Sequence, residues 1–303
     1  MYLDKRVSGN TIITGLIGNP VRHTVSPVLH NSLFNMLGID GIYMPMEVRP
    51  ASLGAAVKGL EALGFTGFNV TIPFKEEIMN YLDVISEEAR LFGAVNTVTV
   101  TDGKLIGYNT DGDGFSIAFR EQAGCGFKNK KICVLGAGGT ARSIAFKAAL
   151  EGASAISIIN RTVKKADELV LRLKEAARSG LFPNCNMTGL TAAALGSEDA
   201  DILLSECDII INTTSVGMYP NIHESPLHGG FTFKSSQIVF DAIYNPPKTK
   251  LLIDAELNGC RIINGAGMLF YQGVRAFEIW TGKPVPDKIT GMLIKEFINY
   301  LKK

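Results

Sequence analysis

The sequence predicts an α/β protein of two domains. Short apolar runs alternate with helical patterns along most of the 303 residues, as expected of βαβ units in a mostly parallel sheet. A chain of this length can bury two separate hydrophobic cores. A polar stretch at residues 124–131 interrupts the apolar pattern. We therefore expect a first domain over residues 1–112 and a second over residues 113–272, with helices in residues 273–303 that pack back on the first.

The first domain is predicted to begin with a strand, a helix and a second strand. Ser26 and Pro27 predict the start of the helix, because serine is a frequent N-cap and proline fits the first helical position. Gly38 predicts its end. The other elements follow from apolar periodicity. Strands are expected at residues 11–17, 42–47 and 68–71, and a further helix at residues 51–63.

The second domain is predicted to follow a connecting helix at residues 113–122. Its strands are expected at residues 132–135, 155–159, 209–212, 238–241 and 261–263. The final helical stretches, at residues 268–281 and 290–301, are not followed by any strand. This is why we expect them to pack against the first domain.

The composition excludes several classes of protein. Thirty basic and 29 acidic residues leave a net charge of +1, so we expect no nucleic-acid surface and no polybasic membrane anchor. No apolar run approaches the ~20 residues of a membrane span, and the N-terminus lacks the apolar core of a signal peptide. The five cysteines are scattered, without metal-like spacing. We expect a cytoplasmic protein with free thiols and no metal.

A glycine-rich loop is the strongest local signal. It follows the strand at residues 132–135 and opens a helix, and it consists of Gly136, Ala137, Gly138, Gly139, Thr140 and Ala141. Glycines let the backbone approach a pyrophosphate, and a helix N-terminus offers unpaired N–H groups. A tight turn in any α/β domain is the alternative. The strand before the loop and the helix after it favour a Rossmann-like dinucleotide site.

The end of the next strand indicates which dinucleotide is bound. NAD sites usually have an acidic residue there, which binds the ribose 2′-hydroxyl. Here a polar and cationic group replaces it: Asn160, Arg161, Thr162, Lys164 and Lys165. A guanidinium binds phosphate through two parallel hydrogen bonds, so the segment predicts NADP. A solvated charge cluster is the alternative, although lysines at a helix N-terminus oppose the helix dipole.

Polar residues also gather at strand ends in the first domain. Residues 69–75 place Lys75 just after a strand, and Asn96 and Asp111 lie in two further polar segments. A lysine and an aspartate make a reasonable proton-transfer pair. Asparagine and aspartate are also common turn residues, and spacing alone leaves this alternative open.

Taken together, these segments resemble the shikimate dehydrogenase family over nearly the whole chain. The resemblance implies that Thr24 and Ser26 bind the substrate carboxylate and that Lys75 is the acid/base group. Asp111 would be the partner of Lys75. Further implied substrate ligands are Thr71, Lys75, Asn96, Asp111, Tyr244 and Gln272. Implied cofactor-binding residues are Gly136, Ala137, Gly138, Gly139, Thr140, Ala141, Asn160, Arg161, Thr162, Lys165, Thr213, Ala242 and Gly265.

The resemblance implies NADP-dependent interconversion of 3-dehydroshikimate and shikimate, in aromatic amino-acid biosynthesis, by a monomer or homodimer. It also implies an N-terminal substrate domain, a Rossmann-like NADP domain and an active site in the cleft between them. The alternatives are a quinate/shikimate dehydrogenase with relaxed cofactor use and a catalytically silent NADP-binding sensor. Where the family usually has serine, this chain has Thr24. Its added methyl and stiffer side chain predict a preference for shikimate over the bulkier quinate.

Overall fold

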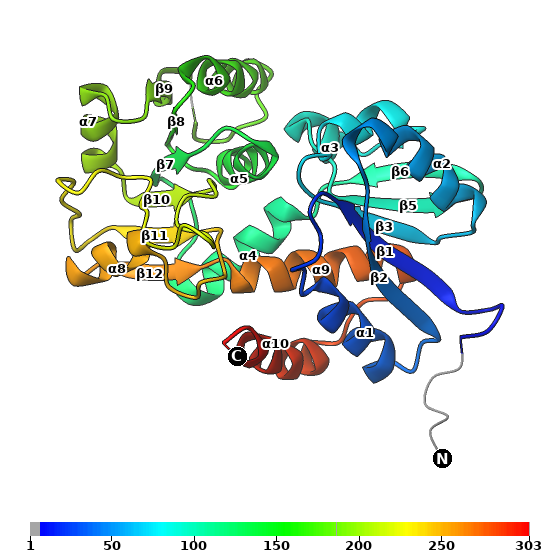
Figure 1. Cartoon of the computed structure of the whole chain (residues 1–303). Helices are drawn as coiled ribbons and strands as arrows, with labels where there is room; N and C mark the ends of the chain where they lie inside the picture. Colours follow the sequence, from blue (N-terminus) through cyan, green and yellow to red (C-terminus); the bar gives the residue numbers. More distant parts are fainter. Residues whose placement is uncertain (1–6, 186, 303) are drawn as a thin grey trace. The chain divides into compact units, whose positions relative to one another are not determined.

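The computed structural model describes residues 7–185 and 187–302 (Figure 1). It divides into two compact units. The first unit consists of the chain up to Thr110 together with Gln272–Phe297, and the second of Asp111–Tyr271 together with the chain from Ile298 onward. Each unit is built on one six-stranded sheet, which confirms the predicted α/β class. Among the described residues, no helix is long and apolar enough to cross a membrane.

The sheet of the first unit mixes parallel and antiparallel strands. Its order is β2-β1-β3-β5-β6-β4. β1 is parallel to β2 and β3, whereas β5 is antiparallel to both β3 and β6. The strands are β1 (Ile12–Gly18), β2 (Gly41–Glu47), β3 (Gly67–Val70), β4 (Val84–Ile85), β5 (Thr97–Thr101) and β6 (Lys104–Tyr108).

The hairpin of β5 and β6 was not predicted. It inserts one antiparallel strand, β5, into a sheet whose other strand pairs are parallel, so the expectation of a mostly parallel sheet still holds for this unit. Asp102 and Gly103 connect the two strands with positive φ at both residues, 51° and 68°, as a type I′ turn requires. Because β5 runs antiparallel to β3, its first residue, Thr97, pairs with Asn69 near the end of β3. The hairpin therefore brings the start of β5 and the end of β6 to the sheet edge where β1 and β3 end.

The helices of the first unit connect these strands, and two more come from the end of the chain. α9 passes from the second unit to the first at Gln272. The helices are α1 (Ser26–Met36), η1 (Pro50–Ser52), α2 (Leu53–Ala62), η2 (Glu77–Tyr81), α3 (Glu87–Phe92), α9 (Ala266–Thr281) and α10 (Asp287–Leu301). The predicted serine cap of α1 is wrong. Val25 has the N-cap position, and Ser26 already lies in the first turn.

The second unit has the strand order of a dinucleotide-binding fold. Its strands are all parallel, in the order β12-β11-β10-β7-β8-β9, which is the doubly wound order 6-5-4-1-2-3. This confirms the predicted Rossmann-like domain. The strands are β7 (Lys131–Leu135), β8 (Ala155–Asn160), β9 (Leu190–Ala194), β10 (Ile209–Asn212), β11 (Ile238–Asp241) and β12 (Arg261–Asn264).

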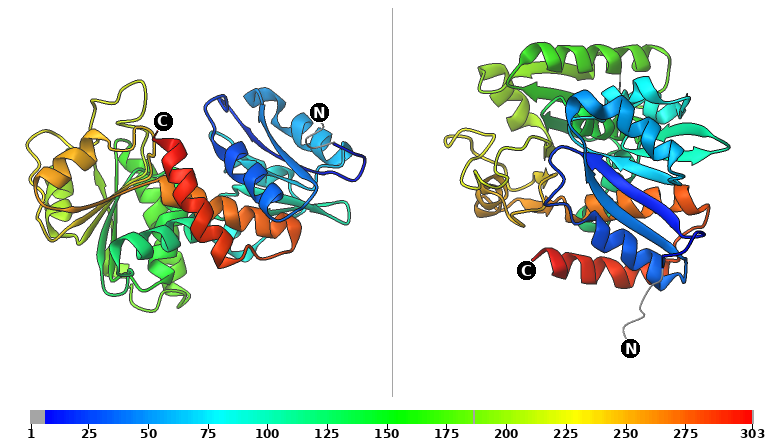
Figure 2. Two further views of the ribbon diagram at one scale, coloured as in Figure 1. Left: turned by 90° about the horizontal axis from the view of Figure 1, so that it is seen from below. Right: turned by 45° about the vertical axis from the view of Figure 1, so that its right-hand side comes forward.

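Helices cover both faces of this second sheet, with α5 and α6 on one face and α7 and α8 on the other (Figure 1; Figure 2 gives further views). Leu204 of α7, Leu252 of α8 and Cys133 of β7 belong to one hydrophobic core cluster. On the opposite face Phe115 of α4 meets Phe240 of β11 edge-on, with ring centroids 4.9 Å apart. The helices are α4 (Asp111–Ala123), α5 (Gly139–Leu150), α6 (Val163–Arg178), η3 (Met187–Gly189), α7 (Glu198–Glu206) and α8 (Lys250–Leu257).

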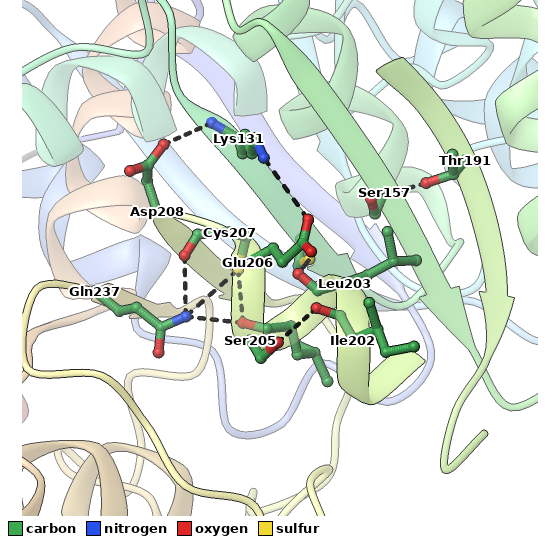
Figure 3. A network of polar contacts seen from close by, with 12 residues as sticks. Lys131, Ser157, Thr191, Ile202, Leu203, Ser205, Glu206, Cys207, Asp208 and Gln237 are labelled. Atoms are coloured by element: carbon green, nitrogen blue, oxygen red, sulfur yellow. Dashed lines mark hydrogen bonds and ion pairs between the residues drawn. The ribbon is translucent and has the colours of Figure 1, made fainter. Parts of the chain in front are cut away.

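A buried amide and a carboxylate connect the starts of three strands in the second unit (Figure 3). The Nε2 group of Gln237 donates to the carbonyl oxygens of Leu204 and Cys207, at 2.8 and 3.0 Å. Carbonyls at a helix C-terminus otherwise lack partners. The main-chain N–H of Lys131 donates to the carboxylate of Asp208 at 2.8 Å. These bonds connect the starts of β7, β10 and β11, so their carboxyl ends keep a fixed register.

Gly67 of β3 is a sensitive position of the first core. An added Cβ there would lie 2.3 Å from the indole of Trp280 and 2.5 Å from the carbonyl oxygen of Val98. Trp280 cannot easily move, because its Nε1 donates to that same carbonyl at 2.9 Å. We predict that Gly67→Ala lowers the free energy of unfolding in urea by roughly 1–3 kcal/mol.

The matched control is Gly59→Ala in α2, where an added Cβ meets no atom within 4 Å. Alanine is a better helix former than glycine, so stability should stay equal or rise by up to ~1 kcal/mol. Equal stability of the two variants would contradict the packing described for Gly67.

Candidate active site

Most of the substrate ligands predicted from the sequence lie where β1 and β3 end in the first sheet. We call this the polar edge of the first sheet. Ser26 follows β1 at the start of α1, Thr71 directly follows β3, and Asn96 directly precedes β5. Gln272 lies in α9. Asn96 and Gln272 are in contact, since Nδ2 of Asn96 lies 3.4 Å from Oε1 of Gln272. Segments that are far apart in sequence thus present hydroxyl and amide groups at one edge.

Thr24 and Ser26 form a compact pair of hydroxyls. The Thr24 hydroxyl donates to that of Ser26 at 3.2 Å, and the main-chain N–H of Ser26 donates to the Thr24 hydroxyl at 3.3 Å. Both lie at the N-terminal end of α1, whose first turn has no acidic residue. Hydroxyl donors beside a helix N-terminus are suited to bind a carboxylate.

Lys75 lies on a well-anchored loop after β3. The carbonyl of Lys75 accepts a hydrogen bond from the main-chain N–H of Val95 at 2.7 Å, and the N–H of Phe74 donates to the carbonyl of Thr71 at 2.9 Å. Phe74 is fully buried. The side chain of Lys75 is therefore attached to a fixed backbone, as a group that exchanges protons with a substrate requires.

His30 is excluded as a proton-transfer group. It is fully buried in α1, where its ring stacks on that of Tyr43 with centroids 4.1 Å apart. Burial lowers the pKa of His30 to about 3. The imidazole is consequently neutral.

The glycine-rich loop of the second unit fits a pyrophosphate. Gly136 has a φ of +110°, and an added Cβ there would lie 2.5 Å from Oγ1 of Thr213. That hydroxyl donates to the carbonyl of Leu135 at 2.7 Å. Gly138 is the N-cap of α5 without any side-chain cap, and its missing Cβ leaves open space. Phosphate oxygens could therefore approach the first N–H groups of α5.

The end of β8 is cationic, as the sequence predicted. Arg161, Lys164 and Lys165 are all exposed, and no acidic side chain of the described residues lies within ion-pair distance of them. The Asn160 amide donates to the carbonyl of Thr162 at 2.9 Å, which orders the turn into α6. Unpaired exposed cations in place of an acid are suited to a 2′-phosphate.

Buried polar contacts order the remaining loops of the second unit. Asn212, at the end of β10, accepts from the N–H and hydroxyl of Thr214 at 3.0 and 2.7 Å and donates to Asp241 at 3.0 Å. An added Cβ at Gly265 would lie 2.0 Å from the carbonyl oxygen of Ala242, so only glycine fits there. Asp111 is the first residue of α4, and Tyr244 follows β11 with its pKa raised by burial.

Comparisons with known proteins agree with this geometry. Three family models match: the shikimate dehydrogenase substrate binding domain over residues 16–98, shikimate/quinate 5-dehydrogenase over residues 118–246, and the shikimate 5′-dehydrogenase C-terminal domain over residues 265–294. A relative named shikimate dehydrogenase (NADP(+)), from Methanopyrus kandleri, is 42% identical and covers 99% of this chain and 100% of its own.

The chain belongs to the shikimate dehydrogenase family.

Solved structures of this family have the same fold. A shikimate dehydrogenase in complex with NADP+ superimposes with a TM-score of 0.85 at 42% identity, over 98% of this chain and 99% of the other. Shikimate 5-dehydrogenase from Listeria monocytogenes, in complex with shikimate and NAD, gives a TM-score of 0.83 at 39% identity, over 95% and 98%. The predicted membership of the shikimate dehydrogenase family is thus confirmed.

Several polar residues of this shikimate dehydrogenase fold were not singled out from the sequence. Tyr43 donates to Asn69 at 2.8 Å, and Thr249 donates to Asp241 at 2.6 Å. Asp241 could have been noticed, because an acidic residue at the end of an apolar strand is unusual. Tyr43 gave no local signal, since tyrosine is common in strands.

Asp241 predicts a pH-dependent stability of the second unit. Burial raises the pKa of Asp241 from 3.8 to about 6, although hydrogen bonds from Thr249, Ile243 and Asn212 oppose the shift. The pKa of Asp241 is higher in the folded state than in the unfolded chain, so protonation of Asp241 stabilises the fold. This stabilising contribution is complete below pH 3.8 and is lost as the pH rises through 6. Relative to Asp241→Asn, we predict that the wild type loses about 2 kcal/mol of unfolding free energy between roughly pH 4.5 and 7.

Urea unfolding at several pH values measures this difference. Asparagine has nearly the same shape but does not titrate, so it isolates the ionisation of this one group. A difference between the two proteins that is constant across the range would contradict the ionisation described for Asp241.

Proposed function

We propose that this protein is an NADP-dependent shikimate dehydrogenase, which reversibly converts 3-dehydroshikimate to shikimate. The proposal depends above all on the full-length similarity to enzymes of that name. The chain has both Lys75 and a cationic end of β8. That combination favours an active NADP enzyme over a silent NADP-binding sensor.

Substrate recognition in this proposal uses the polar edge of the first sheet. Thr24 and Ser26 bind the carboxylate through their hydroxyls, which lie 3.2 Å apart. Asn96 and Gln272 bind ring oxygens, together with Thr71, Asp111 and Tyr244. A small and densely polar substrate needs many partners, because each buried polar group left unpaired costs about 1–3 kcal/mol.

Lys75 is the proton-transfer group. When bound, NADP accepts the hydride from the carbon that carries the reacting hydroxyl. Lys75 takes the proton of that hydroxyl during oxidation and returns a proton to the oxygen during reduction, so charge and atoms balance in both directions. Asp111 orients the lysine and supports its positive charge. The anchored backbone of Lys75 suits this role.

The cofactor is bound by the second unit. Residues 136–141 cradle the pyrophosphate at the N-terminus of α5. The 2′-phosphate binds Arg161, Thr162 and Lys165, with Asn160 shaping the turn. Thr213, Ala242 and Gly265 line the nicotinamide side. The five cysteines are free thiols, which fits our proposal of a reducing cytoplasmic location.

Quinate is the principal alternative substrate. Quinate is tetrahedral at the carbon that bears the carboxylate and has an added hydroxyl there, so it needs more room and one more partner beside Thr24. The methyl of Thr24 fills some of this space and stiffens the side chain. We therefore propose that shikimate is the preferred substrate.

Replacement of Lys75 tests the chemical step. We predict that Lys75→Met lowers kcat for shikimate oxidation by ~10²–10⁴-fold, because a general acid/base contributes about this much. KM should change far less. Steady-state rates at saturating NADP measure both. Lys58→Met, an exposed lysine of α2, is the control and should keep wild-type kcat. A Lys75→Met enzyme with more than about a tenth of wild-type kcat would refute the assignment.

Replacement of Arg161 tests the cofactor preference. Loss of charge-assisted bonds to the 2′-phosphate should weaken NADP binding by roughly ten- to a hundredfold. NAD lacks this phosphate, so its binding should stay the same. Fluorescence titration with both reduced cofactors measures the two constants. Arg178→Ala, at the exposed end of α6, is the matched control. Equal losses for both cofactors in Arg161→Ala would mean that the arginine has only a structural role.

A further inference from the structure

The side-chain amide of Asn96 has a fixed orientation. Its oxygen, Oδ1, lies 2.8 Å from the main-chain N–H of Thr110. A main-chain N–H can only donate, so the amide atom that faces it must be the oxygen. The Nδ2 group of Asn96 therefore points the other way, toward Oγ1 of Thr110 at 2.9 Å and Oε1 of Gln272 at 3.4 Å.

The amide of Asn69 is fixed by the same reasoning. Its Nδ2 lies 3.1 Å from the main-chain carbonyl of Asn96, which can only accept. Its oxygen must then face the hydroxyl of Tyr43, at 2.8 Å, and Tyr43 must donate to it. Tyr43 is 2% and Asn69 6% exposed, so water does not replace these partners.

Thr97 connects the two amides. Its hydroxyl accepts from Nδ2 of Asn69 at 3.0 Å and donates to Oδ1 of Asn96 at 3.0 Å. A hydroxyl has a single proton. Asn69 presents a donor to Thr97, so the proton of Thr97 points to an acceptor. Oδ1 of Asn96, at 3.0 Å, is nearer than the hydroxyl of Thr110, at 3.3 Å, which can itself donate to Oδ1 of Asn96 at 3.2 Å. The bonds from Tyr43 through Asn69 and Thr97 to Asn96 thus all run in one direction, across strands β2, β3 and β5.

We propose that Thr97, with Asn69 and Tyr43 behind it, is a positioning residue that holds Oδ1 of Asn96 together with the main-chain N–H of Thr110, so that the Nδ2 group of Asn96 is directed to the substrate. This inference rests on the proposed function, in which Asn96 binds a ring oxygen. An N–H donor can bind that oxygen whether it is a hydroxyl or a carbonyl, whereas an amide oxygen would bind only a hydroxyl. The fixed polarity therefore suits a site that must accept both an alcohol and its ketone.

Thr97→Val tests the chain of hydrogen bonds, because valine keeps the shape of threonine but lacks its hydroxyl. We predict that kcat/KM for shikimate falls by roughly tenfold, mainly through KM, since the Thr97 hydroxyl no longer accepts from Asn69 or donates to Asn96. KM for NADP should stay within about twofold. Thr97→Ser restores the hydroxyl and should recover most of the loss. Thr99→Val is the matched control. Thr99 lies on the same strand, is 6% exposed and donates to the carbonyl of Thr66, away from Asn96.

A double-mutant cycle with Asn96→Ala separates positioning from stability. If Thr97 acts through Asn96, Thr97→Val should change kcat/KM by less than about twofold once Asn96 is alanine. Should Thr97→Val fail to fold, Thr97→Ala enters the same cycle, and we expect the same loss of effect in the Asn96→Ala background.

Additive effects in the cycle, or an equal loss of activity in Thr99→Val, would overturn the inference. So would failure of Thr97→Ser to recover activity. Absence of shikimate oxidation by the wild-type protein would instead contradict the proposed function, so the two failures are distinguishable.

Discussion

Buried amide side chains at strand ends are the constraint on which both proposed ligand sites depend. Asn69 and Asn96 in the first unit and Asn212 in the second are each at most 6% exposed. Each must find fixed partners, because a buried amide left unpaired costs about 1–3 kcal/mol. The partners lie on neighbouring strands and on the loops that follow them. The loops that present ligand groups therefore keep the geometry of the sheet below them.

The two units differ in the groups that they offer to a negatively charged ligand. The first offers the neutral hydroxyls of Thr24 and Ser26 beside a helix N-terminus, and its buried histidine, His30, is neutral as well. The second unit offers exposed guanidinium and ammonium groups at the end of β8. A small substrate is selected by its shape and its hydrogen bonds, whereas a phosphate is selected by its charge. The two ligands therefore need these two kinds of site.

Features that depend on neighbouring residues could be predicted from the sequence. The loop at Gly136 and the cations around Arg161 follow directly from strand-to-helix transitions within one βαβ unit. The polar network of the first unit could not be predicted in this way. Tyr43 and Asn69 are 26 residues apart, and Asn69 and Thr97 are 28 apart. The first contact depends on the position of β1 between β2 and β3, and the second on the antiparallel pairing of β3 and β5. Apolar periodicity gives no signal for either.

The capping of α1 illustrates the same limit. Serine before proline is a good local signal for a helix start, yet the helix begins one residue earlier and Val25 is the cap. The Ser26 hydroxyl instead pairs with Thr24. Where a residue departs from its usual local role, a ligand-binding role is a common reason. The departure thus supports the pair as the proposed carboxylate site.

The most direct test is a set of initial rates with the wild-type protein, in which shikimate and quinate are each combined with NADP and NAD. Cofactor reduction followed by absorbance reports all combinations on one scale. Our account predicts the highest kcat/KM for shikimate with NADP, with quinate lower by at least roughly tenfold, as steric discrimination of this size usually gives. It predicts a clear preference for NADP over NAD. Equal or faster oxidation of quinate, or a preference for NAD, would contradict it.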